Sequence, residues 1–408
     1  MCRITLQFAF LMLACSSAYG QTPNFFELEP NSTCATGTPF SVGSGLGGGQ
    51  LANVDDVDYF RFSSTSTSAL TLTLAPENSN YDGGVIYAAI YDQSNSLLAR
   101  RRVNSDSPAL PLRAIVGSGT YCLKFDRVPS YQIFTKEYRL LAVTDASDPA
   151  IAGVELEPNN LIAQADELLL DGSPIWSQLS SDVDYDYFRI NASSAQDIDV
   201  SIDVETRGYD GTTLKAWLVD SSGAPLAGRR INSDQASARS LLARRPNGGP
   251  VYVKLEKNEN YSLMDRYVSI SATTSSIFGL RETEPNNFAG SNRVVGPGIL
   301  VGQLSSIDDI DVFDINLMAG VAQFEVRPEN TLYDGGVIIF EVRNSSESVL
   351  TSREVGSDSV SQTVNVGIAT PGVYRIIMKR KVGYQFFDKY YWVTIPAGPE
   401  IFQSGFEI

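Results

Sequence analysis

Three short acidic segments recur along the chain, and each combines two glutamates with a proline and an asparagine. They read ELEPNS at 27–32, ELEPNN at 155–160 and ETEPNN at 282–287, and we name them the EPN segments. About 20 residues after each one comes an aspartate cluster that runs into an aromatic residue, as in DDVDYF at 55–60. Carboxylate and amide oxygens are the ligands that calcium prefers, six to eight of them at ~2.3–2.6 Å. The two motifs together therefore indicate calcium binding.

The spacing within these motifs lets several oxygens meet at one point. Side chains two residues apart in an extended chain point to the same face, so both glutamates of an EPN segment can reach one ion. The aspartates repeat that spacing, and four carboxylates gathered without a cation would repel one another strongly. We therefore predict one calcium site per unit, built from Glu27, Glu29, Asn31, Asp56 and Asp58, from Glu155, Glu157, Asn159, Asp184 and Asp186, and from Glu282, Glu284, Asn286, Asp309 and Asp311.

Two other interpretations of these residues stay open. In one, each Pro-Asn pair makes only a turn at the start of a domain, and the aspartates form a solvated loop. In the other, carboxylates such as Asp308, Asp309 and Asp311 serve a carboxylate-based hydrolase. Catalysis normally needs one specialised site, which three similar acidic loops do not provide. The sequence contains no histidine, and this excludes Ser-His-Asp and Cys-His catalysis and histidine-ligated zinc.

The acidic motifs belong to units that repeat with a nearly constant period. The interval from Glu29 to Glu157 is 128 residues, and the interval from Glu157 to Glu284 is 127 residues. Other landmarks keep step, among them the turn motifs YDGG at 81–84, YDGT at 209–212 and YDGG at 333–336. This period is too long for a solenoid repeat and matches whole domains. We expect tandem domains over 21–150, 151–278 and 279–397, followed by a tail over 398–408.

The elements that must position the acidic residues are predicted to be β-strands. The stretch DIDVSIDVE at 197–205 alternates apolar and polar residues, and ALTLTLAP at 69–76 does the same. Alternation with a period of two is typical of antiparallel sheets with one solvated face. Short strands separated by Gly-containing turns favour β-sandwiches. The predicted fold class is therefore all-β, with three tandem antiparallel β-sandwich domains.

The N-terminal residues are typical of a signal peptide for export. Over 1–20, Arg3 precedes a short apolar core, and Ala18-Tyr19-Gly20 forms a small-x-small cleavage site. A lipoprotein signal with Cys15 as the lipidated residue is the alternative. No other stretch has the ~18 apolar residues that a membrane-spanning helix needs, so we expect a secreted or cell-surface protein without a transmembrane segment.

The cysteine content indicates the redox environment of the protein, and its net charge limits the classes of partner it can bind. Beyond the predicted signal peptide only Cys34 and Cys122 remain, and a pair in an exported chain indicates a disulfide, with two unpaired thiols as the alternative. The net charge of the chain is −16, and removal of Arg3 makes it −17. Such an acidic chain repels phosphate backbones, so we expect no nucleic-acid partner.

The order of motifs resembles the bacterial pre-peptidase C-terminal domain family. The resemblance rests on the EPN segment, a following Gly-x-Leu or Gln-Leu stretch, the Asp-x-Asp-Tyr-Phe cluster and a late Gly-x-Tyr strand, in three copies. It implies a jelly-roll-like β-sandwich that accompanies secreted peptidases, and a collagenase branch whose related domains bind calcium and collagen. Family members often have Asp after the asparagine, where this chain has Ser32, Asn160 and Asn287, and no peptidase-like segment precedes the repeats.

These observations favour a secreted, non-catalytic binding or adhesion protein whose three modules are stabilised by calcium. Three weak sites on one chain give avidity for an extracellular protein or polysaccharide surface. Trp176 is a candidate for stacking on such a partner, and packing inside the protein is its alternative. The competing functions are export or processing accessory domains related to secreted peptidases and, third, the hydrolase named above.

Overall fold

The computed structural model describes most of the chain between residues 22 and 396. The described ranges are 22–76, 85–104, 110–128, 137–145, 153–181, 183–193, 196–205, 213–232, 239–245, 248–258, 266–274, 280–284, 286–290, 292–294, 297–305, 308–329, 337–357, 359–384 and 389–396. The predicted signal peptide, the three Tyr-Asp-Gly turns, the domain boundaries near 150 and 278 and the C-terminal tail lie outside these ranges.

The first ten strands form two sheets of five strands each. One sheet has the order β1-β3-β10-β5-β8, with β1 (Phe25–Phe26), β3 (Leu46–Gln50), β10 (Glu137–Asp145), β5 (Ser68–Pro76) and β8 (Leu110–Val116). The other has the order β2-β4-β9-β6-β7, with β2 (Thr38–Pro39), β4 (Val57–Ser64), β9 (Gly119–Arg127), β6 (Val85–Asp92) and β7 (Leu97–Asn104). We name this pair the first sandwich.

The second and third sandwiches repeat this strand order, except that one sheet of the second has four strands and lacks the short first strand. The second joins β12 (Ile175–Ser177), β19 (Val268–Thr274), β14 (Gln196–Val204) and β17 (Arg239–Arg245) in one sheet, and β11 (Asp166–Glu167), β13 (Tyr185–Ala192), β18 (Gly249–Lys257), β15 (Thr213–Val219) and β16 (Pro225–Asn232) in the other. The third joins β20 (Leu280–Arg281), β22 (Gly298–Gln303), β29 (Tyr390–Ile395), β24 (Gly320–Pro328) and β27 (Gln362–Ile368), and then β21 (Asn292–Val294), β23 (Ile310–Leu317), β28 (Gly372–Arg380), β25 (Val337–Arg343) and β26 (Val349–Gly356).

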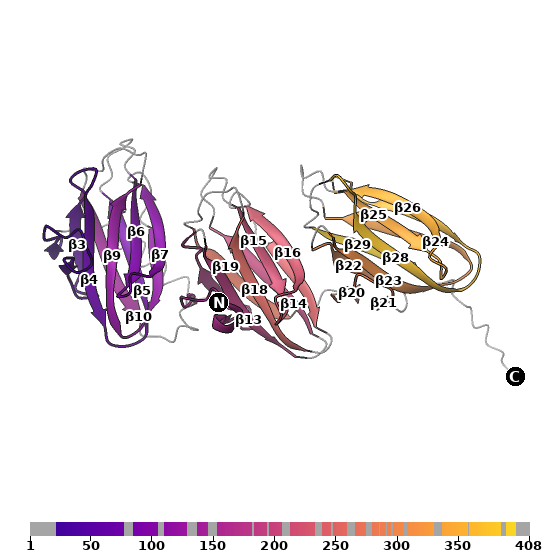
Figure 1. Cartoon of the computed structure of the whole chain (residues 1–408), viewed down its shortest axis with the longest axis horizontal. Coiled ribbons are helices and arrows are strands. Elements are labelled where there is room, and N and C mark those ends of the chain that lie inside the picture. The colour runs from indigo at the N-terminus through magenta and orange to yellow at the C-terminus, as the bar shows by residue number, and fades with distance from the viewer. Residues whose placement is uncertain are drawn as a thin grey trace.

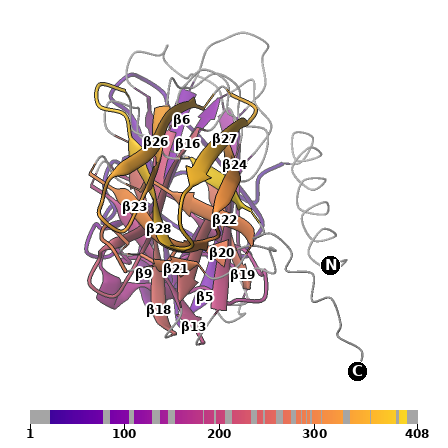
Figure 2. The same cartoon turned by 90° about the vertical axis from the view of Figure 1, so that its right-hand side faces the viewer.

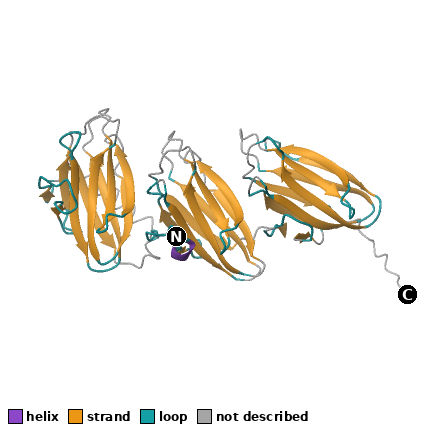
Figure 3. Cartoon of the chain, viewed as in Figure 1, coloured by secondary structure: helices purple, strands orange, loops and turns teal. Residues whose placement is uncertain are grey.

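Side-chain alternation along the strands builds each core between its two sheets. In β14, Ile198, Val200 and Ile202 are fully buried, and they pack in one cluster with Phe188 and Ile190 of β13 in the facing sheet. The intervening polar residues of β14 stay partly solvated, as a period of two requires. The all-β prediction is confirmed, and the one described helical turn is the short 3-10 segment Ile162–Gln164 (Figure 3).

The short first strands of each sandwich depart from the antiparallel prediction. β1 pairs with β3 in parallel, β2 pairs with β4 in parallel, and β20 and β21 pair likewise with β22 and β23. The chain crosses from one sheet to the other after each of these strands, so neighbours within a sheet are two strands apart in sequence and run the same way. The long strands pair in antiparallel fashion, as predicted.

The first sandwich contains the predicted disulfide. Cys34 and Cys122 are bonded, with their Cα atoms 5.7 Å apart. Cys34 follows the first EPN segment, and Cys122 lies in the middle of β9, where it is fully buried. The bond therefore ties the start of the sandwich to the central strand of one sheet.

The three sandwiches lie in a row, each beside the next (Figure 1). The view of Figure 2 runs along this row, and the sandwiches largely overlap in it. Edge strands β7 and β8 of the first sandwich face the second, and β16 and β17 of the second face the third, as contacts described below show. No helix in the described part of the chain is long and apolar enough to cross a membrane.

Candidate metal centres

Each sandwich gathers three carboxylates at one point. One oxygen from each member of a group lies within 4.8 Å of an oxygen from the others. The groups are Glu27, Glu29 and Asp58 in the first sandwich, Glu155, Glu157 and Asp186 in the second, and Glu282, Glu284 and Asp311 in the third. The structure thus brings together both glutamates of each EPN segment and the second aspartate of each aspartate cluster. We name these groups clusters 1, 2 and 3.

The backbone of each EPN segment fixes its cluster between the two sheets. In the second sandwich the Glu155 N–H donates to the Trp176 carbonyl of β12 at 3.0 Å. A few residues on, the Asn159 carbonyl accepts from the Tyr187 N–H of β13, in the facing sheet, at 3.2 Å. Equivalent bonds join the segment to both sheets in the other two sandwiches. Because Asp186 directly precedes Tyr187, this bridge places the aspartate beside the glutamates.

One oxygen of each cluster residue is already held by a hydrogen bond. The Gln178 N–H donates to Glu155 Oε1 at 2.6 Å, and the Asn159 N–H donates to Glu157 Oε2 at 3.2 Å. The aspartate accepts from a hydroxyl, which in the second sandwich belongs to Ser177. Clusters 1 and 3 repeat the pattern with Tyr138 and Tyr391 as the hydroxyl donors.

Several oxygens in and beside the clusters are buried without a hydrogen-bond partner. They are Asn31 Oδ1 and Asp58 Oδ1, then Glu157 Oε1, Asn159 Oδ1 and Asp186 Oδ1, and finally Glu284 Oε1, Asn286 Oδ1 and Asp311 Oδ1. The three asparagines and the three aspartates among them are 0 % exposed. Buried polar atoms are almost always hydrogen-bonded, and leaving one unmatched costs on the order of 1–3 kcal/mol. The orphan oxygens of the asparagine and the aspartate recur in all three sandwiches, and they therefore point to a shared ligand.

Burial and crowding favour the protonated form of the buried carboxyls in the clusters when no cation lies among them. Burial raises the pKa of Glu157 to about 9, and the charges of Asp184 and Asp186 add to the shift. Burial likewise raises the pKa of Asp58 to about 9, against a hydrogen bond from Tyr138 that lowers it. A divalent cation would remove this mutual repulsion, because an opposite charge within a few ångströms favours the ionised form.

The first aspartate of each pair lies beside its cluster and closes its own loop. Asp184 Oδ2 accepts the Ser180 N–H at 2.6 Å, and Asp309 Oδ2 accepts the Ser305 N–H at 2.6 Å. Asp56 holds the Ala52 N–H in the same way, at 2.5 Å. These aspartates are not members of the three-carboxylate groups, but Asp184 and Asp309 act on them electrostatically, since they raise the pKa of Glu157 and Glu284.

Sequence reasoning missed the residues that support the clusters. Tyr138 lies opposite Gly49, and Tyr391 lies opposite Gly302, whereas Val268 lies opposite Ser177. A Cβ at Gly49 or Gly302 would collide with the tyrosine hydroxyl across from it, so a hydroxyl comes from one side of the strand pair or from the other. The first and third sandwiches thus have a Gly–Tyr pair where the second has a Ser–Val pair. This difference can be recognised only when the strand register is known.

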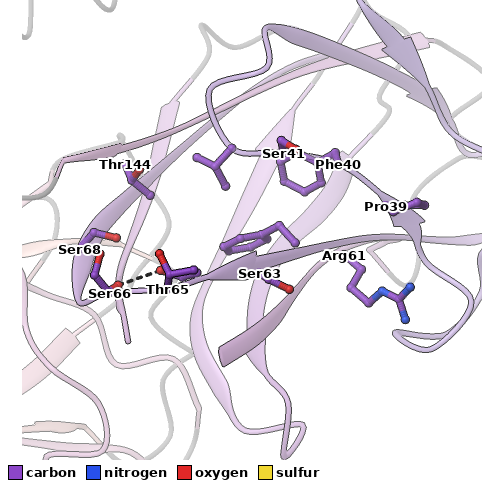
Figure 4. A pocket seen from close by; sticks show the side chains of 12 residues that line it. Pro39, Phe40, Ser41, Arg61, Ser63, Thr65, Ser66, Ser68 and Thr144 are labelled. Atoms are coloured by element: carbon purple, nitrogen blue, oxygen red, sulfur yellow. Dashed lines mark hydrogen bonds between the residues drawn. The ribbon is translucent and has the colours of Figure 1, made fainter. Parts of the chain in front are cut away.

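The first sandwich also has a concave region, where Arg61 and Ser63 of β4 lie near Phe40 and Thr144 (Figure 4). Its volume is about 570 Å³, and its lining combines serine and threonine hydroxyls such as those of Ser63 and Thr65 with the ring of Phe40. Among the described residues of its lining, Arg61 is the one ionisable side chain, so these residues offer no pair of groups for acid–base chemistry.

Comparisons with known proteins found no family model and no curated protein that matches the chain. Among solved structures, a pre-peptidase C-terminal domain of a collagenase from Bacillus anthracis is 15 % identical, covers 28 % of this chain and 98 % of its own, and has a TM-score of 0.22. The CUB1-EGF-CUB2 domain of human MASP-1/3 is 8 % identical over 56 % of this chain and 99 % of its own, with a TM-score of 0.18. Tripeptidyl peptidase 2 is 7 % identical over 85 % of this chain and 34 % of its own, with a TM-score of 0.22. Similarities at this level do not by themselves establish a family or an activity for this chain.

Proposed function

We propose that this protein is an exported, non-catalytic binding protein whose three β-sandwich modules each hold one calcium ion. The observation that carries the proposal is the set of orphan oxygens buried in clusters 1, 2 and 3. Each cluster offers three carboxylates and, in Asn31, Asn159 or Asn286, a neutral carbonyl oxygen. Such an all-oxygen set suits calcium, whereas protein zinc sites normally include histidine or cysteine ligands.

The repetition of the clusters supports binding and stability over catalysis. All three draw their candidate ligands from equivalent positions, and in each the asparagine and the aspartate are buried beside the sheet-bridging EPN segment. A catalytic pair would need an open site beside it for the substrate, and the aspartates here are 0 % exposed. In this proposal the cation holds the start of each module against its sheets.

The proposed partner is an extracellular protein or polysaccharide surface. The Cys34–Cys122 disulfide supports an extracellular role, because disulfides persist in oxidising compartments. Three modules in a row can engage a repetitive surface together, and the resulting avidity does not require a strong single site. Pull-down on insoluble polysaccharides and matrix proteins, in calcium and in EDTA, tests this part. Absence of retention on every surface would contradict it.

Thermal melting with calcium and with EDTA tests the metal sites. Calcium at ~100 times Kd adds about 2.7 kcal/mol per site, which is roughly 10 °C in melting temperature for a domain of this size. The triple variant Asp58→Asn/Asp186→Asn/Asp311→Asn should lose this shift and the heat of calcium binding in calorimetry. An unshifted melting curve together with no binding heat in the unsubstituted protein would overturn the proposal.

A further inference from the structure

The contact between the first and second sandwiches caps two open sheet edges. The Arg113 N–H of β8 donates to the hydroxyl of Tyr267 at 2.5 Å, and that hydroxyl also contacts the Arg113 carbonyl at 3.1 Å. The Arg100 N–H of β7 donates to the side-chain oxygen of Gln178 at 2.7 Å. Edge strands carry unpaired backbone groups that need covering, and here two side chains of the next sandwich cover them. We name this contact joint 1.

The contact between the second and third sandwiches, joint 2, repeats this arrangement. The Leu242 N–H of β17 donates to the hydroxyl of Tyr390 at 2.5 Å. The Gly228 N–H of β16 donates to the side-chain oxygen of Gln303 at 2.8 Å. In both joints, therefore, a tyrosine of the later sandwich binds one edge strand of the earlier sandwich, and a glutamine of the later sandwich binds the other.

An ion pair completes each joint. Arg101 of β7 pairs with Glu205 of the second sandwich, and Arg229 of β16 pairs with Glu329 of the third. The two arginines are 1 % and 7 % exposed. Arg353 occupies the equivalent position of β26 but is exposed, with no sandwich after it in the described chain.

The glutamines of the two joints also contact the carboxylates of clusters 2 and 3. The backbone N–H of Gln178 holds Glu155 Oε1 at 2.6 Å, while its side chain caps β7 of the first sandwich. Gln303 likewise holds Glu282 Oε1 at 2.6 Å through its backbone and caps Gly228 through its side chain. Gln178 and Gln303 are 1 % and 0 % exposed. One buried residue thus touches the cluster of its own sandwich and the edge strand of the preceding one.

In clusters 2 and 3, the residue before the first glutamate makes a second connection to the preceding sandwich. Val154 packs in a buried cluster with Ala69 and Ile115 of the first sandwich. At the equivalent place in joint 2, the Arg281 guanidinium lies 3.7 Å from the carboxylate of Asp197 in the second sandwich. Clusters 2 and 3 are therefore bound to the preceding sandwich on both sides of a ligand.

We infer that a cation in cluster 2 or cluster 3 orders the joint to the preceding sandwich, so that metal occupancy sets how rigidly the three modules are aligned. The inference rests on the proposed calcium binding. A bound cation fixes Glu155 and Glu282 and with them the glutamines, whereas without a cation nothing holds the crowded carboxyls together and both neighbours are released. Coupling of this kind is reciprocal, so loss of a joint contact also weakens calcium binding at the adjoining cluster.

Amide hydrogen exchange on the full mature chain tests the inference, with calcium binding followed by calorimetry on the same sample. Calcium should slow exchange in β7, β8, β16 and β17 by about tenfold or more, as expected when a local opening is suppressed. In Asp186→Asn this effect should disappear from β7 and β8 and persist in β16 and β17. In Asp311→Asn the reverse should hold, so that each variant is the control of the other.

The outcomes separate the inference from the proposed function. If calorimetry shows no calcium binding to the unsubstituted protein, the proposed function fails. If calcium binds and β7 and β8 remain equally protected in Asp186→Asn, the inference is overturned.

A second variant pair covers the case in which Asp186→Asn does not fold. Gln178→Leu keeps the backbone contact to Glu155 and removes the cap on β7, so it should abolish the calcium effect on β7 and weaken calcium binding at cluster 2 by about fivefold. Gln50→Leu is the matched control, because the Gln50 N–H holds Glu27 at 2.7 Å while no sandwich precedes it in the described chain. Equal effects of both substitutions on β7 would contradict the inference.

Discussion

Three aspartates at one strand position are each held by a hydroxyl and left with one orphan oxygen. Asp58 and Asp311 receive the hydroxyl from a tyrosine, and Asp186 receives it from Ser177. The hydroxyl donor differs among the sandwiches, whereas each aspartate keeps one oxygen without a partner. We therefore assign the function of these aspartates to that oxygen. A structural aspartate in a dry core would be expected to satisfy both of its oxygens.

The metal-free protein should lose stability as the pH rises. Burial raises the pKa of Asp186 and Glu284 to about 8 and that of Glu157 to about 9, above the ordinary values of about 4 in an unfolded chain. The folded state therefore binds more protons than the unfolded state between about pH 4 and pH 9, and stability falls with pH across that window. In EDTA we expect a lower melting temperature at pH 8 than at pH 5.5.

Calcium should reverse this trend, because the ion competes with protons for the same oxygens. The calcium-induced rise in melting temperature should therefore be larger at pH 8 than at pH 5.5. A triple Asp→Asn variant at 58, 186 and 311 provides the control, and its melting in EDTA should depend less on pH. A metal-free protein that gains stability from pH 5.5 to pH 8 would contradict the clusters as described.

Residue pairs on neighbouring strands of one sheet decide which side chain donates the hydroxyl to the cluster aspartate. Gly49 faces Tyr138 across β3 and β10, and Ser177 faces Val268 across β12 and β19. The single substitution Gly49→Ser should cost about 1–3 kcal/mol, since its Cβ would meet the Tyr138 hydroxyl. The double variant Gly49→Ser/Tyr138→Val copies the second sandwich and should recover part of that loss.

A double-mutant cycle with chemical denaturation measures this compensation. The two single substitutions and the pair give the coupling free energy directly. A cycle in which the two costs simply add would show that the two sandwiches do not exchange these residues as equivalents.

The disulfide should act on the first sandwich alone. Cys34 and Cys122 are 88 residues apart, and closing a loop of that length stabilises the folded state by about 4 kcal/mol through the entropy of the unfolded chain. Cys34→Ser/Cys122→Ser should therefore lower the melting transition of the first sandwich and leave the other two unchanged in calorimetry. Two thiols titrating in denaturant without reductant would instead show that the bond is absent from the protein.

The joints should add to the stability of the protein beyond that of three separate sandwiches. Arg229→Met removes a buried charge from joint 2 and leaves Glu329 partly buried without its partner, which should cost about 1–3 kcal/mol. Arg353→Met is the matched control at the equivalent, exposed position of β26, and its effect should lie within about 0.5 kcal/mol. Equal losses in both variants, measured by chemical denaturation, would show that joint 2 adds no stability.

Trp176 lies at the contact between the first and second sandwiches. The sequence suggested that it could stack on a partner, with internal packing as the alternative. In the structure it is half-buried against the core of the first sandwich and lies edge-on to Tyr267, with ring centroids 6.5 Å apart. Its contact is thus with the neighbouring module of the same chain.

Much of the molecule could be predicted from the sequence, because it depends on local rules. The period from Glu29 to Glu157 to Glu284 predicted three units, and the alternation at 197–205 indicated strands whose apolar side chains face a core. The EPN segments and the aspartate clusters identified the acidic residues, since their i and i+2 spacing holds wherever the backbone is extended. The pairing of Cys34 with Cys122 was predicted because they are the only two cysteines after the predicted signal peptide.

The tertiary structure alone decided which oxygens meet and what they touch. Asp186 joins the glutamates while Asp184 turns to its own loop, because the bridge from Asn159 to Tyr187 sets the register of β13 against the EPN segment. The joints were likewise hidden, because Gln178 and Arg100 are 78 residues apart in sequence and meet only when two sandwiches lie edge to edge. Contacts of this range depend on sheet order and module packing, and local patterning of the sequence does not encode them.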